Sequence, residues 1–265
     1  MQAGFPFSRF ADRLATQGAL SSDSLDLLAK MPSSISHYGS RHHLMQRGEL
    51  PTHCHLLLQG YLCWQDPDGR DGRIISIHVP GDVPDLYTVH DLQVDYDLVT
   101  VGPAVVASVP HRFFRELAEL SPTLWRSLLR LILIDAATSR NWILNVSSRD
   151  ALERVAHLIC ELATRLRAVG LARDLRVPSP FTQSELAAAC SISAVHANRT
   201  IQELRRSSLL QWHSKTITIT NWYGLVRLAG FNPAYLRLPA IDEVEAAEPP
   251  TARSTEAAVI ADSLR

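Results

Sequence analysis

The sequence has no long hydrophobic run and only four cysteines among its 265 residues. No apolar stretch reaches the ~18 residues of a membrane-spanning helix, so we expect no membrane segment. The first residues lack the apolar core of a secretory signal, so we expect none. Four cysteines are too few for a disulfide scaffold at this length and fit reduced thiols in a cytoplasm. Phosphate-loop, dinucleotide and Gly-x-Ser-x-Gly motifs are also missing, which argues against several classes of enzyme.

Charge is unevenly distributed along the chain, although the net charge is only −1. Residues 1–148 contain 12 basic and 15 acidic side chains, and residues 239–265 contain 2 basic and 6 acidic ones. Between them, residues 149–238 contain 12 basic and 6 acidic side chains, a net charge of +6. A basic segment between acidic neighbours favours a polyanionic partner, although a solvated basic face would have the same composition.

Residues 37–110 alternate short apolar runs with turn residues. The runs at 55–58, 74–79 and 104–109 are typical of strands, and they are interrupted at 66–69 and at 80–81 by proline and glycine. Short strands with frequent turns predict a compact β-barrel or sandwich.

After Val109 the pattern becomes helical. Residues 111–120 predict a short helix, and Ser121 and Pro122 begin a long one that continues to about 147. Seven positions of the long helix follow a heptad spacing: Trp125, Leu129, Ile132, Ala136, Ser139, Ile143 and Val146. A second apolar face is expected to pack on the β-domain: Leu124, Leu128, Leu131 and Leu133. A helix with two apolar faces predicts two partners, one of them a second chain, so we expect a homodimer; packing on its own domain alone is the alternative.

A third helix is expected from Asp150 to about Val169, and residues 181–220 then have the pattern of a helix-turn-helix followed by a hairpin. Thr182 and Glu185 form a capping box before a short helix, and Ser193 caps a second helix that continues to about Ser207. Its predicted buried stripe is Ala197, Ile201 and Leu204, and alternation over 216–220 predicts a β-wing. The residues expected to contact DNA are Thr182, Gln183, Ser193, Ala194, Val195, His196, Asn198, Arg199 and Gln202.

In this order the elements resemble the Crp/Fnr family of bacterial transcription regulators over about residues 20–238. The matching motifs are Gln59-Gly60, residues 78–82, residues 182–186, Ile192-Ser193, Asn198-Arg199 and residues 202–204. The resemblance implies an α+β fold: an N-terminal antiparallel β-roll or jelly roll, a long dimerisation helix and a C-terminal winged helix-turn-helix. It also implies a homodimer on a palindromic operator in double-stranded DNA, contact with RNA polymerase, and an Arg199 that reads guanine.

The expected domains follow from the patterns and the resemblance together. They are a cyclic-nucleotide-binding-like sensor domain (1–121), the dimerisation helix (122–148), the DNA-binding domain (149–238) and a disordered acidic tail (239–265).

The sequence departs from the family pattern where relatives bind cyclic AMP or iron. Val94-Asp95 occupies the place of the family's phosphate-binding Arg-Ser pair, and no lysine or arginine lies between Gly81 and Val109. Five aspartates in that region would repel a phosphate: Asp82, Asp85, Asp91, Asp95 and Asp97. No cysteine precedes Cys54, which argues against an N-terminal iron–sulfur centre. We therefore expect no cofactor and no dependence on cyclic AMP, and the effector stays unidentified.

Histidines and cysteines are concentrated between residues 37 and 63. His53 and His55 flank Cys54 on one predicted strand, so both rings would face the same side and could hold a metal or a haem edge. The spacing matches no metal-binding signature, which favours ordinary solvated histidines and no metal site. The alternative function is a metal or haem sensor, or a metal-dependent enzyme that uses these residues with an acid such as Asp82. We expect no enzyme and no catalytic residue.

Overall fold

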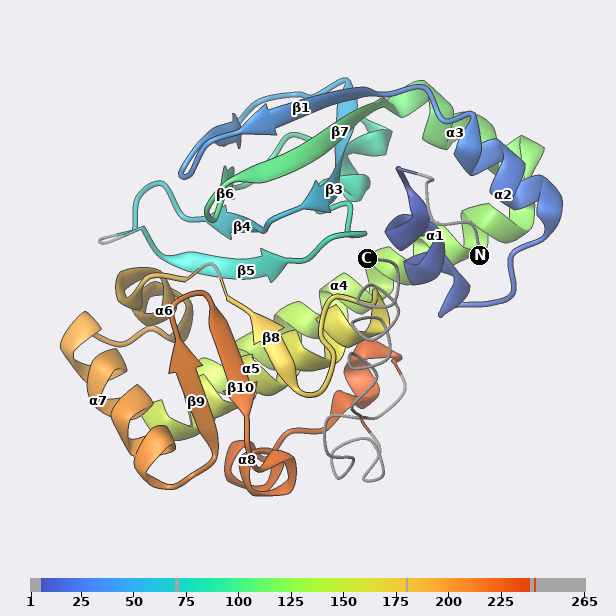
Figure 1. Ribbon diagram of the computed structural model, residues 1–265. Helices are drawn as coiled ribbons and strands as arrows, with labels where there is room; N and C mark the ends of the chain where they lie inside the picture. The colour runs from blue at the N-terminus through green and yellow to red at the C-terminus, as the bar shows by residue number, and fades with distance from the viewer. Residues whose placement is uncertain (1–5, 70–71, 180, 239–240, 242–265) are drawn as a thin grey trace, which may run out of the picture.

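The computed structural model describes residues 6–69, 72–179, 181–238 and 241 (Figure 1). The predicted disordered tail, 239–265, lies outside the described residues except for Ile241. Among the described helices, none is both long and apolar enough to cross a membrane.

Two antiparallel sheets face each other in the N-terminal half. The first has the order β1 (Ser34–Tyr38), β7 (Ala104–Pro110), β3 (His53–Gln59). The second has the order β2 (His43–Met45), β6 (Asp97–Thr100), β4 (Leu62–Gln65), β5 (Ile74–His78). Leu57 and Val106 from the first sheet pack with Trp64 and Leu98 from the second in one buried cluster. The predicted β-roll is confirmed, although its first strand begins three residues earlier than expected.

Two N-terminal helices were missed by the sequence analysis. They are α1 (Ser8–Ala15) and α2 (Ser22–Ala29). Phe10 and Leu14 of α1 are almost fully buried and pack in the cluster that contains Phe114 and Leu124. With only eight residues each, the two helices show little periodicity, so packing rather than local pattern explains their presence.

The long helix α4 (Pro122–Ser148) follows the short helix α3 (His111–Leu120), as predicted. The hydroxyl of Ser121 accepts a hydrogen bond from Leu124 N, and Pro122 occupies the first turn. The inward face contains Leu124, Leu128, Ile134, Thr138 and Trp142. The prediction that Leu133 lies on this face was wrong, because its side chain is 66% exposed. Five residues beyond Leu128, it lies about 140° around the helix from the buried position.

The C-terminal half is a winged helix-turn-helix. It begins with α5 (Ala151–Ala168), whose N-terminus has a capping box of Asp150 and Glu153. The elements that follow are β8 (Arg176–Pro178), α6 (Gln183–Cys190), α7 (Ala194–Arg206), β9 (Leu210–His213), β10 (Thr216–Ile219), α8 (Trp222–Ala229) and the 3-10 turn η2 (Pro233–Leu236). The predicted helices and hairpin are confirmed; β8 and α8 were not predicted.

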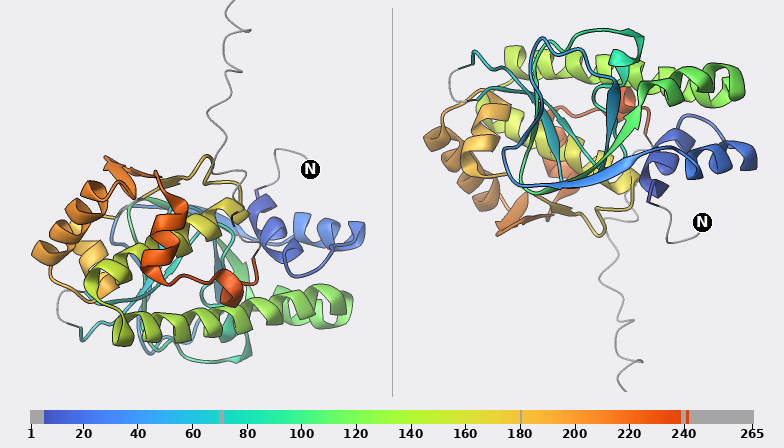
Figure 2. Two further views of the ribbon diagram at one scale, coloured as in Figure 1. Left: turned by 90° about the horizontal axis from the view of Figure 1, so that it is seen from below. Right: turned by 90° about the horizontal axis from the view of Figure 1, so that it is seen from above.

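The C-terminal half packs against the outer face of the second sheet of the roll (Figures 1 and 2). Leu62 and Trp64 of β4 face the roll interior, whereas Cys63 between them belongs to the cluster formed with α5 and α6. The ring of Tyr61 lies 6.0 Å from that of Phe181, and its hydroxyl donates to Pro178 O at 2.5 Å. The strands β4 and β6 in the middle of this sheet are therefore buried on both faces.

Candidate nucleic-acid interface

The two helices of the helix-turn-helix are fixed by local hydrogen bonds at their N-termini. Thr182 Oγ1 accepts from Glu185 N at 3.2 Å, and the Glu185 carboxylate accepts from Thr182 N at 2.7 Å. Ser193 Oγ accepts from His196 N at 3.2 Å at the start of α7. Ser191, between the helices, has a φ of 52°, which makes the tight turn possible. These bonds satisfy backbone N–H groups that would otherwise lack partners, and they define where each helix begins.

One face of α7 anchors it to the domain. Ala197, Ile201 and Leu204 are 0%, 8% and 0% exposed, which confirms the predicted buried stripe. Thr200 is also buried and completes this face. The anchored face leaves the opposite side of α7 open along its length.

The open side of α7 and the start of α6 present small, polar and cationic side chains to solvent. Val195 is 67% exposed, an unusual environment for an apolar side chain. Arg199 is exposed and forms no ion pair within the described part of the chain, so the protein itself does not neutralise its guanidinium. All nine residues predicted to contact DNA are exposed: Thr182, Gln183, Ser193, Ala194, Val195, His196, Asn198, Arg199 and Gln202.

The wing is a short hairpin next to the helix-turn-helix. Ile217 pairs with Trp212 in register, and Ile217 and Ile219 are buried, which confirms the predicted alternation. Ser214 turns the chain with a φ of 54°, and Lys215 beside it is exposed. The wing therefore places a basic side chain at its tip, where it can reach a phosphate backbone.

The histidine and cysteine residues of β3 are not arranged as a metal centre. His53 is exposed and its ring lies 2.9 Å from Thr52 Oγ1, whereas Cys54 is fully buried, which raises the pKa of its thiol. His55 Nδ1 lies 2.7 Å from a carboxylate oxygen of Asp85, and the same carboxylate accepts from His55 N. Within the described residues, no group of three or more His, Cys, Asp or Glu side chains is placed to hold a metal ion.

The acid that the enzymatic alternative requires is also engaged elsewhere. Asp82 Oδ2 accepts from Arg165 Nη2 at 2.6 Å and lies beside Arg13, in the contact between the roll and α5. The structure therefore does not assemble His53, His55 and Asp82 into one site.

The pairing of His55 with Asp85 predicts how the stability of the fold depends on pH. Burial opposes the charged imidazole, but the hydrogen bond to Asp85 and its negative charge outweigh this and raise the pKa of His55 above its usual 6.5. Because the folded-state pKa is the higher one, the pair stabilises the fold fully below about pH 6.5, and the stabilisation is lost as pH rises through the folded-state value. The difference in unfolding free energy between wild type and His55→Gln is expected to shrink across that range in urea titrations.

The exposed neighbour His53 provides the control for this prediction. Because the His53 side chain is exposed, His53→Gln is expected to change the unfolding free energy by no more than about 0.5 kcal/mol. A constant difference between wild type and His55→Gln from below pH 6.5 into the alkaline range would contradict the role given to Asp85.

Known proteins contain a helix-turn-helix region similar to that of this chain. Residues 153–228 match the family model described as a Crp-like helix-turn-helix domain. The anaerobic regulatory protein of Haemophilus influenzae is 26% identical over 172 residues, which cover 64% of this chain and 66% of that protein. The fumarate and nitrate reduction regulatory protein of Yersinia pestis is 26% identical over 164 residues, which cover 62% and 64%. The match thus spans slightly less than two thirds of these relatives, which are regulators and not enzymes.

Solved structures share the fold. FixK2 from Bradyrhizobium japonicum superposes with a TM-score of 0.66 at 17% identity, over 75% of this chain and 98% of that one. A CRP/FNR family transcriptional regulator from Thermus thermophilus has a TM-score of 0.56 at 16% identity, over 75% and 99%.

Proposed function

We propose that the chain is a regulator of the Crp/Fnr type that controls transcription by binding a palindromic operator in double-stranded DNA as a homodimer. The observation that carries this proposal is the open face of α7. This face exposes Val195, Asn198, Arg199 and Gln202, while the opposite face of the helix is buried against the domain. Side chains of this size on such a helix reach base edges when the helix lies in the major groove. The net charge of +6 over 149–238 supports contact with phosphates.

The proposed dimer interface is the outward face of α4, which runs along one edge of the molecule (Figure 2). Leu129 is 40% exposed and Ile143 66% exposed, and Leu133 and Leu144, at 66% and 49%, extend the apolar surface. Along the predicted seam Ala136 and Ser139 are exposed, and three residues are half-buried: Trp125, Ile132 and Val146. Large apolar side chains gathered on one face of a helix favour a second copy of that helix as their partner.

Three parts of the chain take separate roles in this proposal. Residues 1–121 form the sensor domain, 122–148 the dimerisation helix and 149–238 the DNA-binding domain. By analogy with the family, the dimer acts in the cytoplasm and contacts RNA polymerase at its promoter.

Selection of genomic fragments bound by the purified protein tests the function directly. We expect the fragments to share an inverted repeat with half-sites one helical turn, ~34 Å, apart. Fragments without a common motif, bound only through salt-sensitive contacts, would contradict operator recognition.

The roll is expected not to bind cyclic AMP or cyclic GMP at micromolar concentrations. Its interior is filled by apolar side chains, with Trp64 7% exposed and Leu98 fully buried, and the ring of Tyr87 lies 6.2 Å from that of Trp64. At the place of the family's phosphate-binding arginine stands Val94, which is 2% exposed. A cyclic phosphate would therefore lack a charge-assisted pair worth about 1.5–3 kcal/mol. Isothermal calorimetry that measures a micromolar dissociation constant for either nucleotide would refute this.

A further inference from the structure

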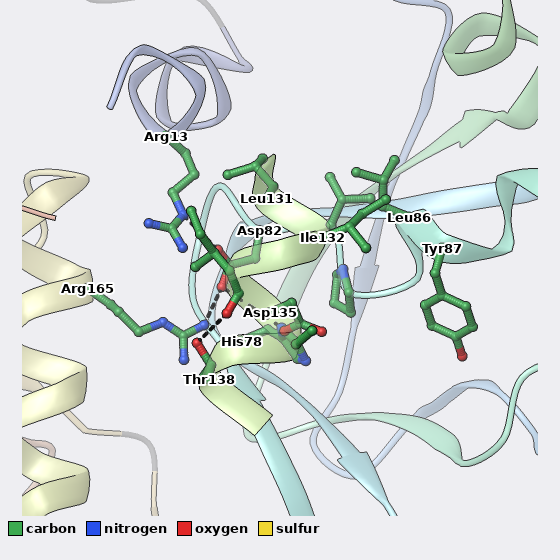
Figure 3. Close-up of a pocket in the computed structure, with 14 residues that line it drawn as sticks. Arg13, His78, Asp82, Leu86, Tyr87, Leu131, Ile132, Asp135, Thr138 and Arg165 are labelled. Atoms are coloured by element: carbon green, nitrogen blue, oxygen red, sulfur yellow. Dashed lines mark hydrogen bonds and ion pairs between the residues drawn. The ribbon is translucent and has the colours of Figure 1, made fainter. Parts of the chain in front are cut away.

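A cavity of about 230 Å³ lies where the roll, α1, α4 and α5 meet (Figure 3). Arg13 extends into it from α1 and Arg165 from α5, while Asp82 comes from the turn after β5 and Leu86 from the start of the 3-10 helix η1 (Leu86–His90). Leu131 and Ile134 of α4 form the apolar wall. The cavity lies outside the interior of the roll, which is filled by its own side chains.

The two guanidinium groups share one carboxylate. Arg165 Nη2 donates to Asp82 Oδ2 at 2.6 Å, and Arg13 Nε lies 3.4 Å from Asp82 Oδ1. Both arginines are buried: Arg165 is 5% exposed and Arg13 is 7% exposed. Asp82 therefore occupies only one edge of each guanidinium.

The remaining edges are not fully satisfied. Arg13 Nη1 and Arg165 Nε are buried and have no hydrogen-bond partner among the described residues. Buried donors of this kind are costly to leave unpaired, and most in native proteins have an acceptor. Both of these unpaired donors belong to arginines that line the cavity.

The other ionisable groups at the cavity are held toward their neutral forms. Burial raises the pKa of Asp135 and lowers the pKa of His78. An incoming anion therefore meets two guanidinium groups, the carboxylate that they share, and Asp135, whose charged form is opposed by burial.

We propose that this cavity is a binding site for a small organic carboxylate, whose oxygens accept from Arg13 and Arg165 and whose hydrocarbon part packs against α4. A carboxylate has the planar pair of acceptors that a guanidinium edge recognises. The apolar wall of Leu86, Leu131 and Ile134 favours an organic anion over a bare inorganic one.

The position of Arg165 connects this site to the DNA-binding domain. Arg165 Nη1 donates to Glu161 Oε1 at 3.1 Å and to Ile77 O at 2.8 Å, so it joins α5 to the roll. Glu161 also accepts from Trp142 of α4 at 3.2 Å and from Tyr235 at 2.7 Å. A ligand that competes with Asp82 for Arg165 would therefore change how the DNA-binding domain is held. This consequence for DNA binding, unlike the site itself, rests on the proposed function.

Calorimetry with the full chain and sodium benzoate or sodium hexanoate tests the site. We expect saturable binding of at least one of these carboxylates. Benzamide and inorganic phosphate are the matched controls, since the first keeps the shape of benzoate without charge and the second keeps charge without an apolar part; both are expected to bind at least tenfold more weakly. Absence of saturable binding by both carboxylates, or equal binding by benzamide or phosphate, would overturn the proposal.

A pair of variants on α1 locates the ligand. Arg13→Gln is expected to weaken carboxylate binding about tenfold or more, whereas Arg9→Gln is expected to leave it unchanged, because Arg9 does not line the cavity. Equal effects of the two variants would overturn the assignment. The comparison of benzoate with benzamide needs no variant, so the proposal stays testable even if Arg13→Gln destabilises the fold.

Operator affinity measured with and without the bound carboxylate separates the two claims. A change in affinity of threefold or more would support coupling through Arg165. An unchanged affinity for a confirmed operator would overturn the coupling while leaving the proposed function intact. Failure to find any operator would count against the function and not against the calorimetry.

Discussion

Replacing Leu133 and Ile143 by glutamate is expected to produce monomers that no longer bind the operator. Each side chain is 66% exposed on the outward face of α4, so the substitutions should leave the monomer folded. In a symmetric dimer they would place four carboxylates in an apolar interface. A monomer binds one half-site alone and loses the effective concentration of the second, which costs on the order of 10²–10⁴ in affinity.

Light scattering and gel shifts on the same preparations check this prediction. Leu50→Glu is the matched control, since Leu50 is 57% exposed in the loop between β2 and β3 and lies off α4. It is expected to stay dimeric and to bind the operator normally. A wild-type protein that is monomeric at micromolar concentration, or a double variant that remains dimeric, would remove α4 as the interface.

Substitution of Arg199 by alanine is expected to weaken operator binding strongly and random-DNA binding only slightly. The side chain is exposed on the open face of α7 and has no ion-pair partner among the described residues, so it is free to meet a base. A bidentate contact to O6 and N7 of guanine discriminates by about 1–3 kcal/mol, or on the order of 5- to 150-fold in affinity. The preference for one base pair in each half-site should relax.

Phosphate contact by Arg199 would give a different result. It predicts uniform weakening on all sequences and a shallower dependence of affinity on salt. Arg206→Ala, at the exposed C-terminal end of the same helix, is the control and should leave the selected motif unchanged. Identical motifs from wild type and Arg199→Ala would show that Arg199 is not a base reader.

The helix-turn-helix could be predicted from the sequence because its signals are local. Thr182 and Glu185 are three positions apart and bond to each other, and Ser193 caps the helix that it begins. The stripe of Ala197, Ile201 and Leu204 follows from helical geometry once that start is known. Here the sequence predicted both the elements and the side that faces solvent.

The long helix was predicted with one error of orientation. Its caps and its heptad spacing are local, but the choice of inward residues depends on how the helix is rotated against the roll. Leu133 was assigned to the roll and is exposed, because the contacts with α1, α3 and β5 turn the face that contains Leu128, Ile134 and Thr138 inward.

The carboxylate site and the pairing of His55 with Asp85 could be found only in the folded chain. Arg13 and Arg165 are 152 positions apart, and no spacing rule relates either of them to Asp82. A periodic sequence pattern arises from the repeating geometry of one helix or strand. It therefore indicates contacts made within a few helical turns or strand steps, and not contacts between distant elements. Contacts between α1, the roll and α5 arise from the packing of whole elements, so the amino-acid order alone indicates which helices form but not which buried charges meet.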